Sequence, residues 1–140
     1  MIDIITSSPL FKGLHPEVIS GIVENANERQ FTTGQLVIQQ GDSLKGLYII
    51  IEGETSIEDK RGEKLFTRGV GDSLGEMTLI DLGTRSVSVR AITDVKIAEI
   101  NLEYMSSLFD ENPKTLTTVA INIARILSNR LRESDKDSMA

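Results

Sequence analysis

The sequence contains no cysteine and no long apolar segment, and each absence excludes a class of protein. Without cysteine, the chain has neither disulfide bonds nor thiolate metal ligands, although this leaves its compartment open. No segment approaches the roughly 20 apolar residues that span a bilayer as a helix. The first residues, Met1–Ile5, include an early acid and no basic region, so they do not resemble a secretion signal. We therefore expect a cytoplasmic protein.

Positive charge and histidine are also scarce. The net charge of −6 makes the chain a poor general partner for anionic membranes, and we expect no direct binding of nucleic acid. The single histidine, His15, lies in a predicted helical region, whereas metal sites in β-rich enzymes usually need several imidazoles. No serine has a candidate base nearby, and no clustered carboxylate motif stands out. We therefore expect no enzyme activity, no catalytic residue and no metal site.

The remaining composition is that of an ordinary globular domain. Hydrophobic residues make up 39% of the 140 positions and charged residues 26%, enough for one domain with its own core. We predict a single domain over residues 1–140. Its expected parts are an N-terminal helical part (1–29), a β-roll (30–101), C-terminal helices (102–133) and a polar, frayed tail (134–140).

Helix signals occur near both ends of the chain. His15-Pro16-Glu17 opens a helix, because proline is tolerated at an early helical position. Asn101 is a candidate cap for a short helix over 102–109, and Pro113 begins a longer helix that reaches about residue 132. The long helix carries an apolar stripe made of Leu116, Val119, Ala120, Ile123, Ile126, Leu127 and Leu131.

Between residues 30 and 100, glycines separate short β-rich runs. The predicted strands cover 35–39, 46–52, 54–59, 64–70, 85–91 and 95–101, with a hairpin tip at Asp59–Glu63. Short strands at this spacing are typical of an antiparallel β-roll or jelly roll, also called a double-stranded β-helix. The predicted fold class is therefore mainly β, with N-terminal helices and a long C-terminal helix.

The most informative stretch covers residues 74–86. Gly75 lets the backbone approach a ligand closely, and a turn into a short helix behind it offers free N–H groups to an anion. Glu76 supplies a carboxylate for hydroxyl groups, and Arg85 supplies a guanidinium that can bind phosphate oxygens in pairs. These groups together suit a ribose that carries a phosphate.

This stretch resembles the phosphate-binding cassette of cyclic nucleotide-binding domains. Its sequence is Gly71-Asp72-Ser73-Leu74-Gly75-Glu76-Met77-Thr78-Leu79, followed by Thr84-Arg85-Ser86-Val87-Ser88-Val89-Arg90-Ala91. Thr33–Asp42 resembles the family's early β-roll turn, and Leu47–Glu54 resembles its central strand and hairpin. The family includes sensor domains of bacterial catabolite-activator-type regulators, protein kinase A regulatory subunits and cyclic nucleotide-gated channels. The resemblance covers roughly residues 8 to 132.

The resemblance implies a role for each cassette residue. Glu76 would accept hydrogen bonds from the ribose 2′-hydroxyl. Arg85 would pair with the exocyclic phosphate, through charge-assisted bonds worth about 1.5–3 kcal/mol each. The backbones of Gly75, Met77 and Thr78 would contact the phosphate. The other readings of the two charged residues are a solvated acid at a helix start and a surface arginine that pairs with Glu76.

Three further cassette residues complete the predicted ligand-binding set. Leu74 packs either against the sugar or base or into the core, and Ser86 adds a hydroxyl to the phosphate. Val87, like Val89, lines the barrel. The cassette departs from the common pattern at Thr78, where Ala or Gly is usual, and in lacking a proline before Arg85. We expect both departures to affect affinity more than binding competence.

In this family a C-terminal helix closes the pocket, and the resemblance implies this role for residues 113–132. Arg130 is the candidate that covers the base, and Asn129 is a weaker one; the other reading of Arg130 is an exposed arginine at a helix end. A seam-like spacing of four and three residues joins Leu116, Ala120, Ile123, Leu127 and Arg130. The seam favours either packing on the β-roll or a homodimer, as in catabolite-activator-type relatives.

The sequence therefore predicts a regulatory domain that binds a cyclic mononucleotide, cyclic AMP (cAMP) ahead of cyclic GMP (cGMP), without a cofactor. Movement of the C-terminal helix would signal to an unidentified protein effector. One alternative is an interaction or dimerisation module that keeps the fold without the ligand. A second is the sensor half of a larger transcription regulator. A cupin-like metalloenzyme shares the jelly-roll shape but needs more histidine ligands. The choice of base, or a cyclic dinucleotide in its place, is open.

Overall fold

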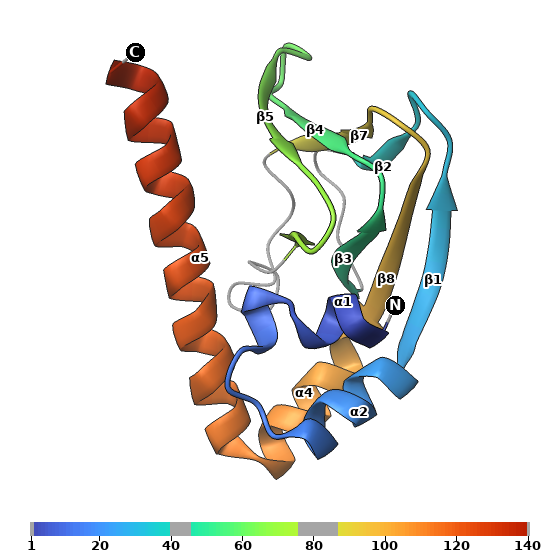
Figure 1. The fold of residues 1–140 in the computed structure, drawn as a ribbon, viewed down its shortest axis with the longest axis vertical. Helices are drawn as coiled ribbons and strands as arrows, with labels where there is room; N and C mark the ends of the chain where they lie inside the picture. Colours follow the sequence, from blue (N-terminus) through green and yellow to red (C-terminus); the bar gives the residue numbers. More distant parts are fainter. Residues whose placement is uncertain (1, 40–45, 76–86, 140) are drawn as a thin grey trace.

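The computed structural model describes residues 2–39, 46–75 and 87–139 (Figure 1). Within these residues, eight strands form two antiparallel sheets of four strands each. The first sheet has the order β1 (Ala26–Phe31), β8 (Val95–Asn101), β3 (Gly46–Glu52) and β6 (Ser73–Leu74). The second has the order β2 (Leu36–Ile38), β7 (Ser88–Ala91), β4 (Thr55–Glu58) and β5 (Lys64–Arg68).

Helices flank this roll at one end and along one side. The N-terminal elements are α1 (Ile2–Thr6), the 3-10 turn η1 (Pro9–Phe11) and α2 (Pro16–Glu24). The C-terminal elements are α4 (Leu102–Glu111) and the long α5 (Pro113–Met139), which extends beside the roll from its helical end (Figure 1). The prediction of an antiparallel β-roll with flanking helices and a long C-terminal helix is confirmed.

Strand β3 is central because its side chains are buried on both faces. Leu47, Ile49 and Ile51 belong to a core shared with the helices, where they are joined by residues such as Phe11, Met105, Val119 and Ile123. Tyr48 and Ile50 point the other way, into the interior of the roll. Successive strand residues face opposite sides, so this continuously apolar strand separates two cores.

The helix starts follow local sequence signals. The Asn101 side chain accepts hydrogen bonds from the backbone N–H groups of Glu103 (2.7 Å) and Tyr104 (3.2 Å), which caps α4 as predicted. The ring of His15 accepts from the N–H of Glu17, and Pro16 occupies the first turn of α2. These caps orient α2 and α4 against the first sheet.

Strand β1 was not expected, because its sequence is largely polar. Four of its residues, 27–30, are exposed at the edge of the first sheet, where only Phe31 is fully buried. Its backbone pairs with β8 from Ala26 to Phe31, so hydrogen bonding rather than side-chain burial holds it. The roll therefore begins at Ala26 and not at residue 30.

Helix α5 extends further than predicted and packs through only part of the predicted stripe. It continues to Met139, because neither glycine nor proline follows Pro113 in the sequence. Val119 and Ile123 are buried, whereas Leu116 and Leu131 from the predicted stripe are exposed. The predicted seam therefore does not form one free face, since Ile123 packs in the core. In the described part of the chain, no helix is long and apolar enough to cross a membrane.

The turn between β3 and β4, which lie in different sheets, requires a glycine at position 53. Gly53 has a φ of 91°, in the left-handed region, and a Cβ there would lie 2.2 Å from the carbonyl oxygen of Asp94. This tight turn brings the two sheets together at the end of the roll away from the helices. The glycine motif singled out in the sequence at 47–54 thus has a steric reason.

Candidate ligand-binding site

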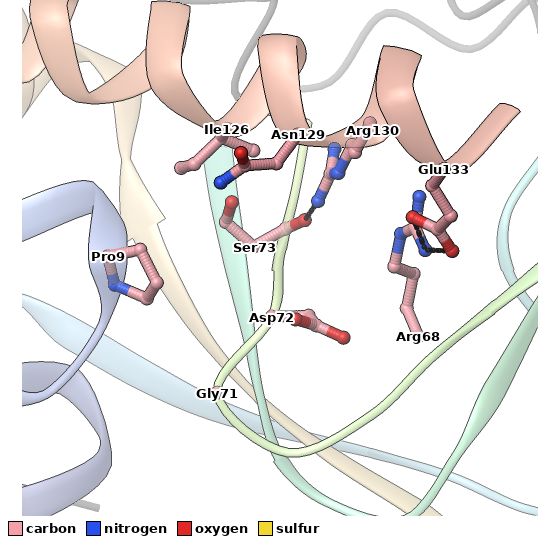
Figure 2. A pocket seen from close by; sticks show the side chains of 9 residues that line it. All are labelled: Pro9, Arg68, Gly71, Asp72, Ser73, Ile126, Asn129, Arg130 and Glu133. Atoms are coloured by element: carbon pink, nitrogen blue, oxygen red, sulfur yellow. Dashed lines mark hydrogen bonds and ion pairs between the residues drawn. The ribbon is translucent and has the colours of Figure 1, made fainter. Parts of the chain in front are cut away.

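A cavity of about 210 Å³ lies between α5 and the turn that leads into β6 (Figure 2). It is lined by residues from η1, the end of β5, that turn and α5, namely Pro9, Arg68, Gly71, Asp72, Ser73, Ile126, Asn129, Arg130 and Glu133. The turn belongs to the start of the predicted cassette, and α5 is the predicted closing helix. The cavity therefore lies where these two predicted parts of the site meet.

Backbone hydrogen bonds fix the start of the cassette on strand β3. The N–H of Gly71 donates to the carbonyl of Ile50 (2.9 Å), and the N–H of Ile50 donates to the carbonyl of Asp72 (3.0 Å). The carboxylate of Asp72 accepts from the N–H of Gly69 at 2.8 Å, which closes the turn. This segment is thus held by the central strand of the first sheet.

The last cassette residues described before Glu76 are Leu74 and Gly75. Leu74 is buried in the roll interior with Tyr48 and Ile50, which agrees with the core reading of this residue. Gly75 has a φ of 84°, a left-handed conformation that glycine adopts without a steric penalty. The chain therefore turns sharply just before Glu76.

Two arginines connect α5 to the roll across the cavity. Arg130 donates from Nη2 to the carbonyl oxygen of Ser73 at 2.8 Å. Arg68 donates from Nη1 to both carboxylate oxygens of Glu133, at 3.2 and 3.3 Å, and to the carbonyl of Thr67 at 3.0 Å. Figure 2 shows both contacts beneath the same stretch of α5. The second half of the helix is therefore joined to the cassette and to β5 by charged side chains.

Two residues that line the cavity, Arg68 and Ser73, each bury a polar side-chain atom that has no hydrogen-bond partner in the part of the chain that the structure describes. Arg68 is 8% exposed and Ser73 is 3% exposed. Among the described residues, nothing forms a hydrogen bond with Arg68 Nε or Ser73 Oγ. Leaving such a group unsatisfied costs about 1–3 kcal/mol.

A second polar cluster lies on the first sheet, where the partly exposed Arg29 and Glu99 meet the buried Tyr48. Nη1 of Arg29 is 2.9 Å from the hydroxyl of Tyr48 and 3.0 Å from the carboxylate of Glu99. Burial, followed by the influence of Glu99, raises the pKa of Tyr48 above its usual 10.0, so the phenol stays protonated at neutral pH. The Arg29 guanidinium also lies 5.2 Å from the ring centre of Phe31. This cluster holds β1, β3 and β8 together.

The predicted site residues divide into those the structure places and those it does not. Glu76, Met77, Thr78, Arg85 and Ser86 lie outside the described residues. Leu74, Gly75, Val87 and Arg130 are described; Val87 is half-buried just before β7, and Arg130 contacts the cassette. Arg130 therefore faces the predicted site and not open solvent, whereas the covering of a base by Arg130 stays a prediction.

Sequence reasoning missed Arg68, Ser73 and Glu133. Arg68 ends a strand in which it alternates with Phe66, whose ring centre lies 5.3 Å from the guanidinium. This alternation is the one sign in the sequence that Arg68 shares a strand face with an aromatic residue, because side chains two positions apart in a strand point to the same side. Glu133 lies near the predicted end of the C-terminal helix, and nothing in the sequence indicates that its partner is Arg68. Among the described residues, no group of three or more histidine or acidic side chains is placed to hold a metal ion.

Comparison with known proteins defines the class to which this fold and site belong. The model of the cyclic nucleotide-binding domain family matches residues 28–112, which is more than half of the chain. The chain therefore belongs to the cyclic nucleotide-binding domain family, as the cassette predicted.

Individual relatives agree with this assignment. The chain is 33% identical over 132 residues to the Cyclic AMP receptor protein of Thermus thermophilus, covering 91% of this chain and 59% of the relative. It is 27% identical over 141 residues to a CRP-like cAMP-activated global transcriptional regulator of Mycobacterium tuberculosis, covering 98% and 61%. The crystal structure of Thermus thermophilus Catabolite Activator Protein has a TM-score of 0.74 and 33% identity, over 93% of this chain and 61% of that one. The chain thus spans about three fifths of the length of these relatives.

Proposed function

We propose that this chain is a sensor domain that binds a cyclic mononucleotide, cAMP ahead of cGMP, between its cassette and α5. The observation that supports this most directly is the bond from Arg130 of α5 to the carbonyl of Ser73. It brings the closing helix to the residue that precedes Leu74 and Gly75, over a cavity that both segments line. Two relatives whose names refer to cAMP add further support.

In this proposal each cassette residue contacts one part of the nucleotide. Arg85 pairs with the phosphate, Glu76 accepts from the ribose hydroxyl, and the backbone of Gly75, Met77 and Thr78 contacts the phosphate. Ser86 adds a hydroxyl, while Leu74 and Val87 supply apolar surface. The left-handed conformation of Gly75 supports this arrangement, because it turns the chain where a ligand needs close backbone approach.

We further propose that α5 transmits the signal by a shift in population between two positions. Its second half contacts the roll through Arg68–Glu133 and Arg130–Ser73, which are polar contacts that a polar ligand can replace. A ligand moves such an equilibrium only by its difference in affinity for the two states. The receiving partner is an unidentified protein effector.

The remaining expectations form part of the same proposal. We propose a single non-enzymatic, cytoplasmic domain over residues 1–140, without a cofactor or direct contact to nucleic acid. Homodimerisation through α5 is supported by the exposed apolar side chains of Leu116, Ile121 and Leu131. Two alternatives compete with this reading, an interaction module without a ligand and the sensor half of a longer transcription regulator.

The test is isothermal titration of the chain with cAMP, cGMP and cyclic di-GMP. We expect micromolar or tighter binding of one cyclic mononucleotide. Arg85→Ala should lower the affinity about ten- to a hundredfold, because a charge-assisted contact is lost. Glu76→Ala should lower the affinity less. Arg61→Ala, which changes an exposed arginine near the hairpin tip, is the matched control.

Three results would contradict parts of this proposal. Equal affinity in the wild-type protein and in Arg85→Ala would overturn the site assignment. Absence of binding by all three ligands would favour the interaction module. Binding without any change in hydrogen exchange along α5 would overturn the proposed movement while leaving the binding function intact.

A further inference from the structure

We propose that Arg68 is a base-reading residue of the ligand site, whose Nε donates a hydrogen bond to a ring nitrogen of a purine. Ser73, which lines the same cavity, contributes its hydroxyl. This inference rests on the proposed binding of a cyclic nucleotide and adds to it the part of the site that recognises the base. Neither residue was among the candidates that the sequence indicated.

The first argument is the incomplete hydrogen bonding of Arg68. Its Nη1 is engaged by Thr67 and Glu133, whereas its buried Nε has no acceptor among the described residues. Ser73 Oγ is in the same condition, and both residues line one cavity. Native proteins rarely leave buried polar atoms unsatisfied without a reason. A bound group with an acceptor would satisfy Arg68 Nε.

The second argument is the size of the cavity. About 210 Å³ is several times the roughly 30 Å³ that one water occupies. It is below the roughly 300–1,000 Å³ typical of pockets for whole ligands. The cavity therefore suits one portion of a nucleotide. Because Ser73 directly precedes Leu74 and Gly75, where the proposed sugar and phosphate contacts begin, the portion left for this cavity is the base.

The third argument is the charge of the lining. Arg68 and Arg130 contribute two positive charges, and Asp72 and Glu133 contribute two negative ones. A balanced lining gives no net attraction to a phosphate, which in proteins is usually bound by an excess of positive charge. A neutral heterocycle with ring-nitrogen acceptors fits such a lining and the unused N–H donor of Arg68.

The position of Arg68 also connects the base to the closing helix. Its guanidinium is held by Glu133, which lies 65 residues away in the sequence and on α5 (Figure 2). A base that bonds to Nε would therefore touch a side chain already joined to that helix. The competing explanation is that Arg68 only ties β5 to α5 and never contacts a ligand.

The experiment pairs a change in the protein with a change of single atoms in the ligand. Wild type and Arg68→Met are titrated with cAMP and with its 1-deaza, 3-deaza and 7-deaza analogues, in each of which a C–H replaces one ring nitrogen. We expect one analogue to bind the wild type about ten- to a hundredfold more weakly than cAMP. In Arg68→Met that analogue and cAMP should bind equally. Arg61→Met, a matched change at an exposed arginine, should behave as the wild type.

The outcomes separate this inference from the proposed function. If cAMP binds and Arg85→Ala weakens that binding as expected, but all analogues bind the wild type as well as cAMP does, only the role of Arg68 is overturned. The role of Arg68 is also overturned if one analogue binds more weakly than cAMP by the same factor in the wild type and in Arg68→Met. If the wild type binds neither cAMP nor cGMP, both proposals fail; if it binds cGMP alone, the proposed function stands and the deaza analogues of cGMP test Arg68 in the same way. The comparison of cAMP with its deaza analogues in the wild type does not depend on Arg68→Met. The inference can therefore be overturned even if that variant does not fold.

Discussion

The two halves of α5 are held against the rest of the molecule in different ways. In the first half, Val119 and Ile123 are buried in the helical core, and Asn122 donates to the carbonyls of Leu10 and Lys12, both at 2.9 Å. Ile126 and Leu127 still pack against this core near the middle of the helix. Beyond them, Arg130 and Glu133 contact the roll through charged side chains, while Leu131 is 64% exposed. One helix thus combines an apolar anchor with a polar attachment.

This difference indicates which part of α5 can respond to a ligand. A small polar ligand offers no substitute for apolar burial, so under the proposed function we expect the first half to keep its place. Hydrogen bonds to Ser73 and Arg68 are of the kind that a nucleotide can exchange for its own. Local opening is expected where buried apolar contacts are few. The following changes test whether the two halves differ in this way.

The largest effect is expected from truncation in the anchored half. Ile123→Ala should lower the free energy of unfolding by about 2–5 kcal/mol, because it removes buried methyl groups and leaves a cavity. Leu131→Ala, the matched change in the second half, should alter it by less than about 0.5 kcal/mol. Urea unfolding of both variants measures the difference. Similar losses that depend on protein concentration would instead indicate that Leu131 is buried between subunits.

An intermediate effect is expected from the buried amide of the anchor. Asn122→Ala should cost about 1–3 kcal/mol of unfolding free energy, because the carbonyls of Leu10 in η1 and of Lys12 just after it lose their donor. Asn129→Ala, at an exposed position in the second half of α5, serves as the control. Thermal and urea unfolding check the pair. An unchanged stability in Asn122→Ala would mean that water replaces the amide and that the anchor is apolar only.

The smallest effect on stability is expected from the polar attachment. Glu133→Gln should change the unfolding free energy by no more than about 1 kcal/mol, since Glu133 is 44% exposed and solvent screens its pair with Arg68. Its effect should instead appear locally, as faster hydrogen exchange in the second half of α5 and not in the first. Raising the salt concentration of the wild type should act in the same direction. Glu111→Gln is the control; faster exchange along the whole of α5 would remove the distinction between the halves.

Much of the fold could be predicted because its signals are local. The strands around 46–52 and 95–101 are apolar runs bounded by turn residues, and the caps at Asn101 and Pro113 mark helix starts. Strand β1 could not be predicted in this way, because the polar run from Ala26 to Gln30 gains its structure only by pairing with β8. Leu116 and Leu131 were wrongly placed on the packed face of α5, since periodicity alone does not say which of two apolar faces meets the core.

The same division applies to the candidate site. The cassette could be recognised in the sequence, because its glycines and charged residues are close together and the chemistry depends on their order. The place of Arg68 in the candidate site could not be predicted from the sequence, because a charged residue at a strand end is usually solvated. Its importance follows from burial under α5 and from a partner on that helix, neither of which has a sequence signature.

By itself, the sequence of this chain determined its β-roll class, its helix caps and the cassette with its family, because each depends on neighbouring residues. Only the tertiary structure decided that Arg130 meets Ser73 across 57 positions and that Arg68 meets Glu133 across 65. Such contacts depend on how α5 settles against the roll. That position is set by the burial of Val119 and Ile123 in a core drawn from both ends of the chain, which no local pattern encodes.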